Sequence, residues 1–282
     1  MDDKILEQII EFAIFEDIKT GDITSLACIP HNAKGKMKLL VKQDGILAGV
    51  EIAKAVFNKI DQNLSIEILI KDGTPVKAGD VAFYIEGNVI SLLTSERLVL
   101  NIMQRMSGIA TETRRYANKL TDFKTQVLDT RKTSPGLRLL EKEAVRLGGG
   151  TNHRMGLYDM MMIKDNHIDF AGGVQKAILA ANKYKKDNNL NVKIEIEARC
   201  FDEIAEILKI GMVDIIMIDN FTPEETLKAV QMIDGKYKTE SSGGITIENI
   251  AEYAKCGVDY ISIGALTHQI KSLDLSLKAV DF

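Results

Sequence analysis

The sequence predicts an α/β protein in which an incomplete parallel β/α barrel follows a smaller α+β domain of the open-sandwich type. The barrel is predicted because short apolar runs alternate with helical segments six times in about 150 residues. The smaller domain is predicted because β-branched runs surround a single helix in the preceding part of the chain. A chain of 282 residues is long enough for both domains.

The first predicted domain covers residues 1–105 and begins with a helix. Between Asp3 and Phe15 apolar residues recur at helical spacing, and the turn-rich segment EDIKTGDIT follows. Strand candidates then alternate with one helix, VEIAKAVFNKI, and the segment DGTPVKAGD is typical of a surface turn between strands. We expect residues 268–282 to return to this domain at the end of the chain.

The second predicted domain covers residues 106–267 and is entered through a long amphipathic helix over Ser95–Leu120. A later helix starts with a capping box at Thr222, where Pro223 and Glu225 follow. Because strands separated by helices run parallel, the regular alternation indicates a β/α barrel short of the usual eight strands. The six strand candidates are TQVLD, MMMIK, VKIEIEA, DIIMID, YKTE and DYISIG.

Composition argues against several classes of protein. The net charge of -4 is unsuited to coating nucleic acid, which needs a basic surface. No apolar run is long enough for a membrane span, and MDDKILEQII lacks the pattern of a signal peptide. Cys28, Cys200 and Cys256 are too far apart to predict a disulfide framework or a zinc cluster. We therefore expect a cytoplasmic protein without nucleic-acid or membrane partners.

A polar or small residue lies at the carboxyl end of each strand candidate. Neighbouring members of this set are 22 to 33 residues apart, which is about one β/α unit. The carboxyl ends of the strands of a parallel barrel meet at one rim, where barrel enzymes have their active sites. These residues should therefore face one mouth: Arg131, Lys164, Glu197, Asp219, Ser242 and Gly264.

Basic residues predict an anionic ligand at this mouth. Two of them are arginines, and a guanidinium binds a carboxylate or a phosphate through two parallel hydrogen bonds. Lys164 follows three methionines and is expected to be buried, which is costly for an ammonium group unless it meets an anion. The five potential cations are Arg131, Lys132, His153, Arg154 and Lys164.

Glu197 and Asp219 end the third and fourth predicted strands. Two carboxylates beside a polyanionic ligand indicate a divalent cation between them, and Mg²⁺ fits best. Two alternatives stay open, since either carboxylate could be a general base and Asp219 could belong to a plain turn. Because side chains alternate along a strand, Glu195 shares a face with Glu197, and which of the two faces the site also stays open.

Glycines after the last two strand candidates indicate a phosphate site. In barrels, the loops after the last two strands commonly bind phosphate through backbone amides. Here these loops contain Ser242, Gly243 and Gly244, and then Gly264 one unit later. The three glycines 148–150 most simply stop the preceding helix, LRLLEKEAVRL.

With these motifs the chain resembles the quinolinate phosphoribosyltransferases, also called carboxylating nicotinate-nucleotide pyrophosphorylases. The resemblance runs through nearly the whole length and is far more specific than any one motif. It is carried by EDIKTGDIT, NIMQRMSGIAT, LDTRKTSPGLRLLEKEAVRLGGGTNHRMGLYD, MIKDNH, IEIEA, MIDNF, ESSGG and GVDYISIGALTH. It implies a pentosyltransferase that joins quinolinate to phosphoribosyl pyrophosphate with decarboxylation, giving nicotinate mononucleotide, pyrophosphate and CO₂ for NAD biosynthesis.

The resemblance also implies a role for each matching residue. The residues that hold quinolinate are Arg105, Arg131, Lys132, His153 and Arg154, with Thr130 beside them. The catalytic residues, which act on the ribose, the pyrophosphate and Mg²⁺, are Lys164, Glu197 and Asp219. The residues that surround the 5′-phosphate are Ser242, Gly243, Gly244 and Gly264. Family members are at least dimers, and the arginine that matches Arg105 enters the neighbour's site, so a dimer or a hexamer is expected.

Three other interpretations compete with this one. A related barrel protein encoded with molybdate-transport genes shares the TRKT and HR elements. A non-catalytic barrel could bind a sugar phosphate as a sensor, although Lys164, Glu197 and Asp219 argue against it. Lys164 could also be a Schiff-base lysine of an aldolase-type barrel, which would require an apolar neighbourhood.

Overall fold

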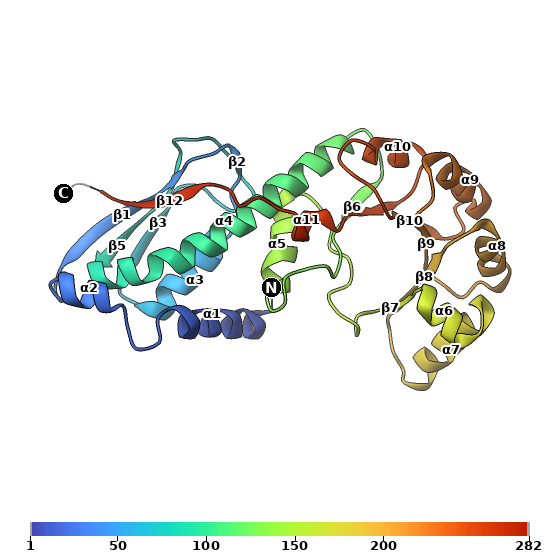
Figure 1. Cartoon of the computed structure of the whole chain (residues 1–282), viewed down its shortest axis with the longest axis horizontal. Helices are drawn as coiled ribbons and strands as arrows, with labels where there is room; N and C mark the ends of the chain where they lie inside the picture. Colours follow the sequence, from blue (N-terminus) through green and yellow to red (C-terminus); the bar gives the residue numbers. More distant parts are fainter. Residues whose placement is uncertain (1, 281–282) are drawn as a thin grey trace. The chain divides into compact units, whose positions relative to one another are not determined.

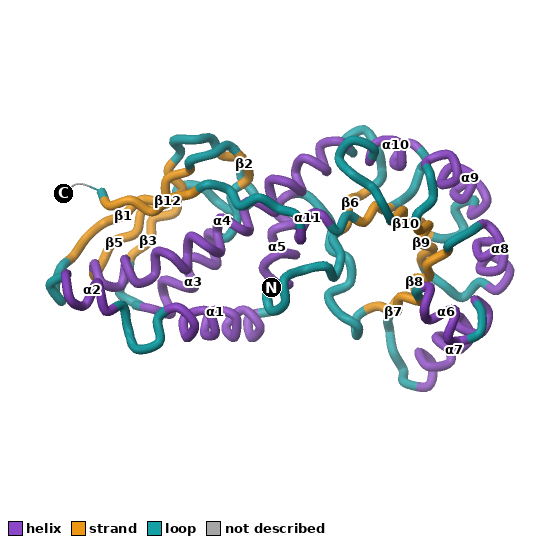
Figure 2. Tube along the Cα trace, in the orientation of Figure 1, coloured by secondary structure: helices purple, strands orange, loops and turns teal. Residues whose placement is uncertain are grey.

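The computed structural model describes residues 2–280, which form two compact units with separate sheets (Figure 1, Figure 2). The first unit takes residues 2–114, 133–149 and 265–280, and the second takes residues 115–132 and 150–264. The predicted fold class is confirmed, because one unit has an antiparallel sheet and the other a parallel one. Residues 1, 281 and 282 of the predicted domains lie outside the described part.

The predicted single boundary between residues 105 and 106 does not describe the two units, because the chain passes between them several times. Residues 133–149, which the sequence pattern assigned to the barrel, belong to the first unit and form helix α5 (Arg138–Gly148). An amphipathic pattern shows that one face of a helix is buried, but not against which partner. The chain from residue 265 also belongs to the first unit, and strand β12 (Leu275–Ala279) pairs there with β1 (Lys34–Val41).

A four-stranded antiparallel sheet forms the base of the first unit. In β1 the buried positions Met37, Leu39 and Val41 alternate with more exposed ones, so only one face of the sheet is covered. Helices α3 (Val50–Ile60) and α4 (Val89–Lys119) lie along that face (Figure 1). The strand order is β12, β1, β5 (Val81–Asn88) and β3 (Ser65–Ile68).

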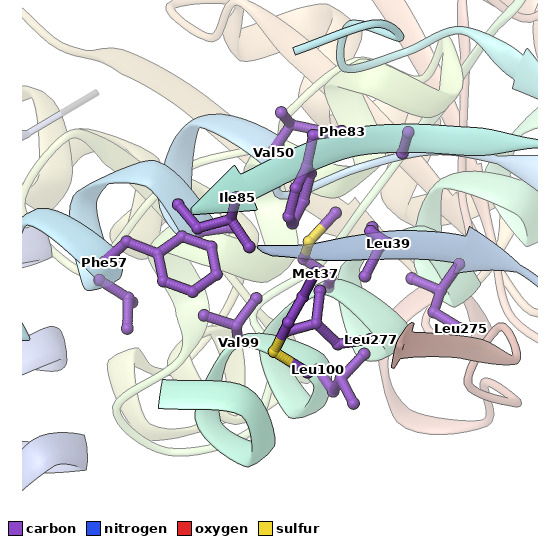
Figure 3. Close-up of a cluster of buried hydrophobic side chains, with 14 of the residues drawn as sticks. Met37, Leu39, Val50, Phe57, Phe83, Ile85, Val99, Leu100, Leu275 and Leu277 are labelled. Atoms are coloured by element: carbon purple, nitrogen blue, oxygen red, sulfur yellow. The ribbon is translucent and has the colours of Figure 1, made fainter. Parts of the chain in front are cut away.

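The core of the first unit lies between this sheet and the two helices (Figure 3). Leu39 in β1 lies opposite Phe83 in β5 on one side and Leu277 in β12 on the other. Phe57 of α3 meets Phe83 edge to face, with ring centroids 6.0 Å apart. The carboxyl-terminal strand therefore contributes to the same core as the first strand of the chain.

Helix α5 ends at the glycines 148–150 for two reasons. Gly149 caps the helix in the left-handed conformation, with a φ of 95°. Gly148 lies so close to α4 that a Cβ there would be 2.5 Å from the carbonyl oxygen of Ala110. The remaining elements of this unit are α1 (Asp3–Asp17), α2 (Ile23–Cys28), β2 (Gly45–Ile46), β4 (Pro75–Val76) and α11 (Ala265–His268).

The second unit is a curved sheet in which every strand pairing is parallel. All six predicted strands are present, in the order β6 (Gln126–Leu128), β11 (Tyr260–Ser262), β10 (Lys238–Ser242), β9 (Ile215–Asp219), β8 (Lys193–Ala198) and β7 (Met160–Ile163). Figure 1 shows the helices on the outer side of the arc. They are α6 (Asp165–Ala171), α7 (Val174–Asp187), α8 (Phe201–Ile210), α9 (Pro223–Ile233) and α10 (Ile250–Lys255).

The arc is open between β6 and β7, as expected of an incomplete barrel. In the described chain no strand ladder joins these two strands, and Leu128 of β6 makes an isolated bridge to Thr151. As an edge strand, β7 leaves Met160, Met161 and Met162 half-buried, whereas the central β8 and β9 are almost wholly buried. Among residues 2–280, no helix has the length and apolarity that crossing a bilayer requires.

Candidate active site

Side chains at the carboxyl ends of the strands of the second unit line a cavity of about 150 Å³. Because side chains alternate along a strand, the residue two positions before each rim residue lies below it on the same face. Met162 thus lies below Lys164, and Met217 lies below Asp219. The lining residues are Thr130, Arg131, Lys132, His153, Arg154, Met162, Lys164, Met217, Glu240 and Ser262.

The structure brings together most of the residues predicted to hold an anion. Thr130, Arg131 and Lys132 follow β6, and His153 and Arg154 come from the segment that leads to β7. The Thr130 hydroxyl accepts a hydrogen bond from the Lys132 N–H at 3.0 Å, which shapes the turn after β6. Five predicted residues and Lys164 therefore line one cavity, although they are up to 34 residues apart in the sequence.

Basic side chains outnumber acidic ones in the lining of the cavity. Burial and the nearby charge of Arg131 lower the pKa of the Arg154 guanidinium. The Arg154 side chain also donates a hydrogen bond to the carbonyl oxygen of Met160 at 3.2 Å, which fixes it near the start of β7. Two guanidinium groups that repel each other in a partly buried site would be stabilised by a bound anion.

Lys164 and Glu197, which were both predicted to lie at the rim, form an ion pair with each other. Lys164 Nζ lies 2.9 Å from Glu197 Oε2. The Glu197 side chain is 8% exposed and that of Lys164 is 44% exposed, so the expectation that Lys164 is buried was wrong. The reason is that Lys164 follows an edge strand and reaches the rim. A half-exposed lysine paired with a carboxylate lacks the apolar neighbourhood of a Schiff-base lysine.

Asp219 lies close to this pair at the end of β9. Burial and the charge of Glu197 raise the pKa of the Asp219 carboxyl, while a hydrogen bond with the Ser242 side chain opposes the shift. The two carboxylates therefore repel each other across the rim. Two neighbouring carboxylates that repel each other are suited to a divalent cation, which prefers oxygen ligands.

The predicted phosphate loop comes directly after strand β10. Ser242 is the last residue of β10, and its carbonyl oxygen accepts a hydrogen bond from the Asn220 N–H at 2.9 Å. Gly243 has a φ of 93°, and a Cβ there would lie 2.1 Å from Asn220 Oδ1. Gly244 is also left-handed, at 62°, but has open space around it. Both its left-handed backbone and its close contact with Asn220 therefore require a glycine at position 243. The other predicted phosphate residue, Gly264, lies two residues beyond the end of β11.

His153 is held by protein groups at both ring nitrogens. Nε2 lies 3.0 Å from Glu195 Oε2 and 3.2 Å from Glu240 Oε2, and both glutamates are fully buried. Nδ1 accepts the Arg154 N–H at 2.6 Å. Burial lowers the pKa of His153 and the two carboxylates raise it, with the carboxylates prevailing. A second proton would nevertheless have to displace the Arg154 N–H from Nδ1, so the geometry favours the neutral ring with its proton on Nε2.

Among the described residues, His153, Glu195 and Glu240 form the group of three potential metal ligands whose ligand atoms lie within 4.8 Å of one another. A histidine that binds a metal through Nε2 carries its proton on Nδ1. Here Nδ1 is the acceptor of a backbone N–H. In this cluster the two glutamates therefore face a ring proton on Nε2, not a metal ion.

The sequence left open whether Glu195 or Glu197 faces the site. In the structure both face inward, Glu195 toward His153 and Glu197 toward Lys164.

The two buried carboxylates of Glu195 and Glu240, which share a proton when folded, predict a pH dependence of stability. Burial and the charge of Glu240 raise the pKa of Glu195 from 4.5 to about 7. The folded protein then holds a proton that the unfolded chain loses, so stability is lost as the pH rises from about 4.5 to about 7. Glu240→Gln removes the repulsion, so its stabilising effect on the folded chain, measured as the increase in the free energy of unfolding over the unmodified chain, should be about 2 kcal/mol larger at pH 8 than at pH 5. Urea unfolding at both pH values measures this.

The control for this measurement is Glu206→Gln, which neutralises an exposed glutamate of α8. It should leave the pH dependence of unfolding as it is in the unmodified chain. An equal pH dependence in Glu240→Gln would show that the two buried carboxylates do not share a proton.

Arg105 lies in the first unit, apart from the group that lines the rim cavity. Its Nε and Nη2 donate to Glu141 Oε1 at 2.8 and 2.6 Å, and Nη2 also donates to Ser134 Oγ at 2.9 Å. Glu141 is 1% exposed, so this is a largely buried ion pair. Arg105 also lines a cavity of about 250 Å³ between α1, α4 and α5.

Comparison with known proteins identifies the family. Residues 22–107 match the quinolinate phosphoribosyl transferase N-terminal domain, and residues 109–278 match the C-terminal domain. This chain belongs to the quinolinate phosphoribosyltransferase family. The resemblance inferred from the motifs is therefore confirmed.

Individual relatives of the quinolinate phosphoribosyltransferase family match nearly the whole chain. The carboxylating nicotinate-nucleotide pyrophosphorylase of Arabidopsis thaliana chloroplasts is 43% identical over 97% of this chain and 82% of the relative. The probable carboxylating enzyme of Bacillus subtilis is 42% identical over 96% of this chain and 92% of the relative. The crystal structure of NadC from Streptococcus pyogenes superposes with a TM-score of 0.93 at 39% identity, covering 100% of this chain and 99% of that one.

One residue of this quinolinate phosphoribosyltransferase site, Glu240, was not predicted from the sequence, and the place of Glu195 was left open. Both glutamates contact His153 below the cavity. The alternation of side chains carried the signal, because Glu240 precedes Ser242 by two residues just as Glu195 precedes Glu197. The backbone of His153 adds a further contact, since its N–H donates to Asp129 Oδ1 at 2.8 Å.

Proposed function

We propose that this chain transfers the phosphoribosyl group of phosphoribosyl pyrophosphate to quinolinate and releases pyrophosphate and CO₂, giving nicotinate mononucleotide for NAD biosynthesis. One observation carries the proposal. A cavity lined by Arg131, Lys132 and Arg154 adjoins the Lys164–Glu197 pair at the same rim. A dicarboxylate and a pyrophosphorylated sugar are the two anions that such a pair of adjoining sites would bring together.

The cavity binds the two quinolinate carboxylates in this proposal. Arg131 and Arg154 supply planar donors that match a carboxylate, and Lys132 supplies a point charge. Met162 and Met217 line the cavity below and offer an apolar surface for the pyridine ring. The same contacts orient the ring nitrogen, so that part of the entropic barrier to transfer is overcome on binding.

The rim residues act on the sugar donor. As the bond from C1 of the ribose to pyrophosphate lengthens, the sugar becomes oxocarbenium-like and negative charge builds up on the leaving oxygens. Lys164 stabilises this charge, while the carboxylates of Glu197 and Asp219 lie beside the developing positive charge. The pyridine nitrogen attacks C1, and the carboxylate next to that nitrogen then leaves as CO₂, with the electron pair left on the ring carbon beside the cationic nitrogen. That carbon takes up a proton from water to give nicotinate mononucleotide. No protein nucleophile takes part.

We propose that Mg²⁺ assists this reaction. The mutual repulsion of Glu197 and Asp219 supports this, because a divalent cation held by the two carboxylates would offset it. When bound, the ion neutralises charge on the leaving group. The two carboxylates would hold it directly or through water.

Chelation tests the role of the metal. EDTA should lower product formation by at least about a hundredfold, and excess Mg²⁺ should restore it. Asp219→Asn, which loses one negative ligand, should need a higher Mg²⁺ concentration for half-maximal activity. Full activity in EDTA would contradict the proposal, and Lys193→Ala, a change at the opposite end of β8, should respond to Mg²⁺ as the unmodified chain does.

We also propose that the active enzyme is a homodimer or a hexamer, in which Arg105 enters the neighbour's site. Arg105 does not line the rim cavity of its own chain, and it lines a second cavity in the first unit. A second copy that brings Arg105 to the rim would add a third guanidinium to the quinolinate site. A cytoplasmic location is proposed on the basis of Cys28, Cys200 and Cys256, which are free thiols as in reducing compartments.

Quinolinate binding tests the carboxylate site. Calorimetric titration should show quinolinate binding at least about tenfold more tightly than nicotinate, because nicotinate lacks one carboxylate and leaves a cation unpaired. Arg131→Ala should weaken quinolinate binding by about 10- to 100-fold. Arg146→Ala, which removes a surface arginine paired with Glu143, is the matched control and should bind normally. Equal affinity for both acids would contradict the assignment of the cavity.

A further inference from the structure

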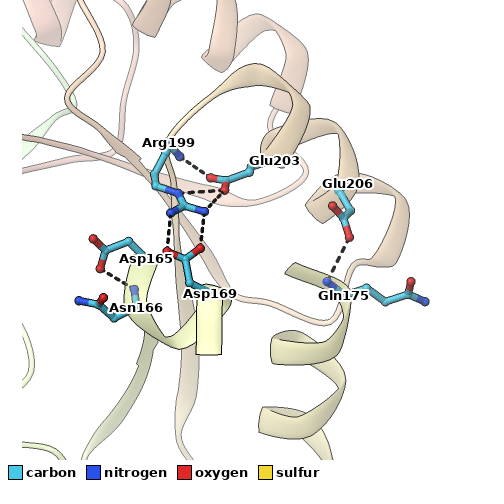
Figure 4. A network of polar contacts seen from close by, with 7 residues as sticks. All are labelled: Asp165, Asn166, Asp169, Gln175, Arg199, Glu203 and Glu206. Atoms are coloured by element: carbon cyan, nitrogen blue, oxygen red, sulfur yellow. Dashed lines mark hydrogen bonds and ion pairs between the residues drawn. The ribbon is translucent and has the colours of Figure 1, made fainter. Parts of the chain in front are cut away.

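Arg199 makes a polar network that the reaction above leaves unused (Figure 4). It follows β8 by one residue, and its guanidinium donates to Glu203 Oε1 from Nε at 2.9 Å and from Nη2 at 2.6 Å. Nη1 and Nη2 also donate to the two carboxylate oxygens of Asp169, at 3.1 and 3.0 Å. The Arg199 N–H donates to Glu203 Oε2 at 2.7 Å. One side chain thus joins the β8–α8 turn to α6.

These two segments directly follow the two partners of the Lys164–Glu197 ion pair. Helix α6 begins directly after Lys164, and Asp169 lies within it. Arg199 lies two residues beyond Glu197, which is in β8. The contact between Arg199 and Asp169 therefore joins the chain just after Lys164 to the chain just after Glu197.

Helix α6 is short and has little buried surface of its own. It has seven residues, too few for a helix to be stable by itself, and Ile168 is its one buried side chain. Its neighbour Phe170 is 92% exposed and anchors nothing within this unit. A paired guanidinium and carboxylate with two parallel hydrogen bonds fixes orientation as well as distance. The position of Lys164 follows from the position of this helix.

We propose that Arg199 is a positioning residue that holds α6 against the β8–α8 turn and so keeps Lys164 and Glu197 in place for phosphoribosyl transfer. This inference rests on the proposed function and deepens it. Arg199 itself touches neither the rim cavity nor Lys164 in the structure. Because Arg199 and Asp169 are largely exposed, with side chains 39% and 59% accessible, their ion pair adds little to global stability.

The test compares variants of the full-length chain by steady-state kinetics. Arg199→Ala should lower kcat/KM for phosphoribosyl pyrophosphate about tenfold, while KM for quinolinate stays within about twofold. Arg199→Lys keeps the charge but cannot donate in parallel, so it should recover less than half of the loss. Asp169→Asn should resemble Arg199→Ala, and the double variant should be no worse than Arg199→Ala, because both changes break one contact.

Glu206→Gln is the matched control within the same region. Glu206 also ties α8 to a neighbouring helix, since its Oε1 accepts the Gln175 N–H of α7 at 3.1 Å, but it does not reach α6 (Figure 4). Its kcat/KM should stay within about twofold of that of the unmodified chain. Activity of Arg199→Ala within this same range, or additive losses in the double variant, would overturn the inference.

Amide hydrogen exchange provides a readout that does not depend on the reaction. Residues 165–171 should exchange faster in Arg199→Ala and Asp169→Asn than in the unmodified chain or in Glu206→Gln. An unmodified chain that makes no nicotinate mononucleotide would overturn the proposed function, whereas unchanged exchange in α6 would overturn the role of Arg199 alone.

Discussion

Replacing Lys164 with alanine is expected to lower kcat/KM by about a thousandfold, or about 4 kcal/mol of transition-state stabilisation. The change removes the cation that faces Glu197 at 2.9 Å and that is proposed to stabilise the leaving pyrophosphate. The loss should appear mainly in kcat, because the charge that Lys164 stabilises is largest in the transition state. Steady-state assay of nicotinate mononucleotide formation measures it.

Lys193→Ala is the matched control for this prediction. Lys193 begins β8 and lies exposed at the opposite end of the strand from the rim, so its loss should leave kcat/KM within about twofold. The melting temperature of Lys164→Ala should fall by no more than a few degrees, since Lys164 is 44% exposed. A Lys164→Ala enzyme with more than a tenth of normal kcat would remove Lys164 from the catalytic residues.

Arg105→Ala should be nearly inactive by itself and should regain activity when mixed with Lys164→Ala. In a mixed dimer, one site combines the intact Lys164 of one chain with the intact Arg105 of the other, and the second site has neither. Random exchange makes half of the dimers mixed, so the mixture should reach about a quarter of normal activity. Activity is measured after subunit exchange at several mixing ratios.

A second variant controls for a loss of stability in Arg105→Ala. This change leaves the buried Glu141 carboxylate without its partner, which costs about 3 to 5 kcal/mol. Arg105→Lys keeps a positive charge beside Glu141 and serves as the comparison. Regained activity in the mixture also shows that the Arg105→Ala chain is folded. A mixture no more active than its two components would show that Arg105 does not act across chains.

The fold was predictable from the sequence because its determinants are local and periodic. All six barrel strands lie where apolar runs alternate with helical segments, and α9 begins with the capping box at Thr222. The assignment of residues 133–149 was not predictable in the same way. The pattern of α5 shows an apolar face, whereas its partner is fixed by the close approach of Gly148 to α4, a contact between distant parts of the chain.

The site was predictable to the extent that strand ends meet at one rim. Arg131, Lys164 and Glu197 follow from that rule, and the cavity and the ion pair bring them together. The expected burial of Lys164 was wrong because the sequence does not show that β7 is an edge strand. The cluster of His153 and Glu240 depends on the packing between two loops and two strands, which local spacing does not reveal.

We expect this chain to condense a pyridine dicarboxylate with phosphoribosyl pyrophosphate and to remove one carboxylate. The most direct measurement incubates the purified chain with quinolinate, phosphoribosyl pyrophosphate and Mg²⁺ and follows nicotinate mononucleotide, pyrophosphate and CO₂ together. Equal amounts of all three products, with little or no reaction when nicotinate replaces quinolinate, are the predicted result. Absence of the nucleotide, or equal activity with nicotinate, would contradict the claim.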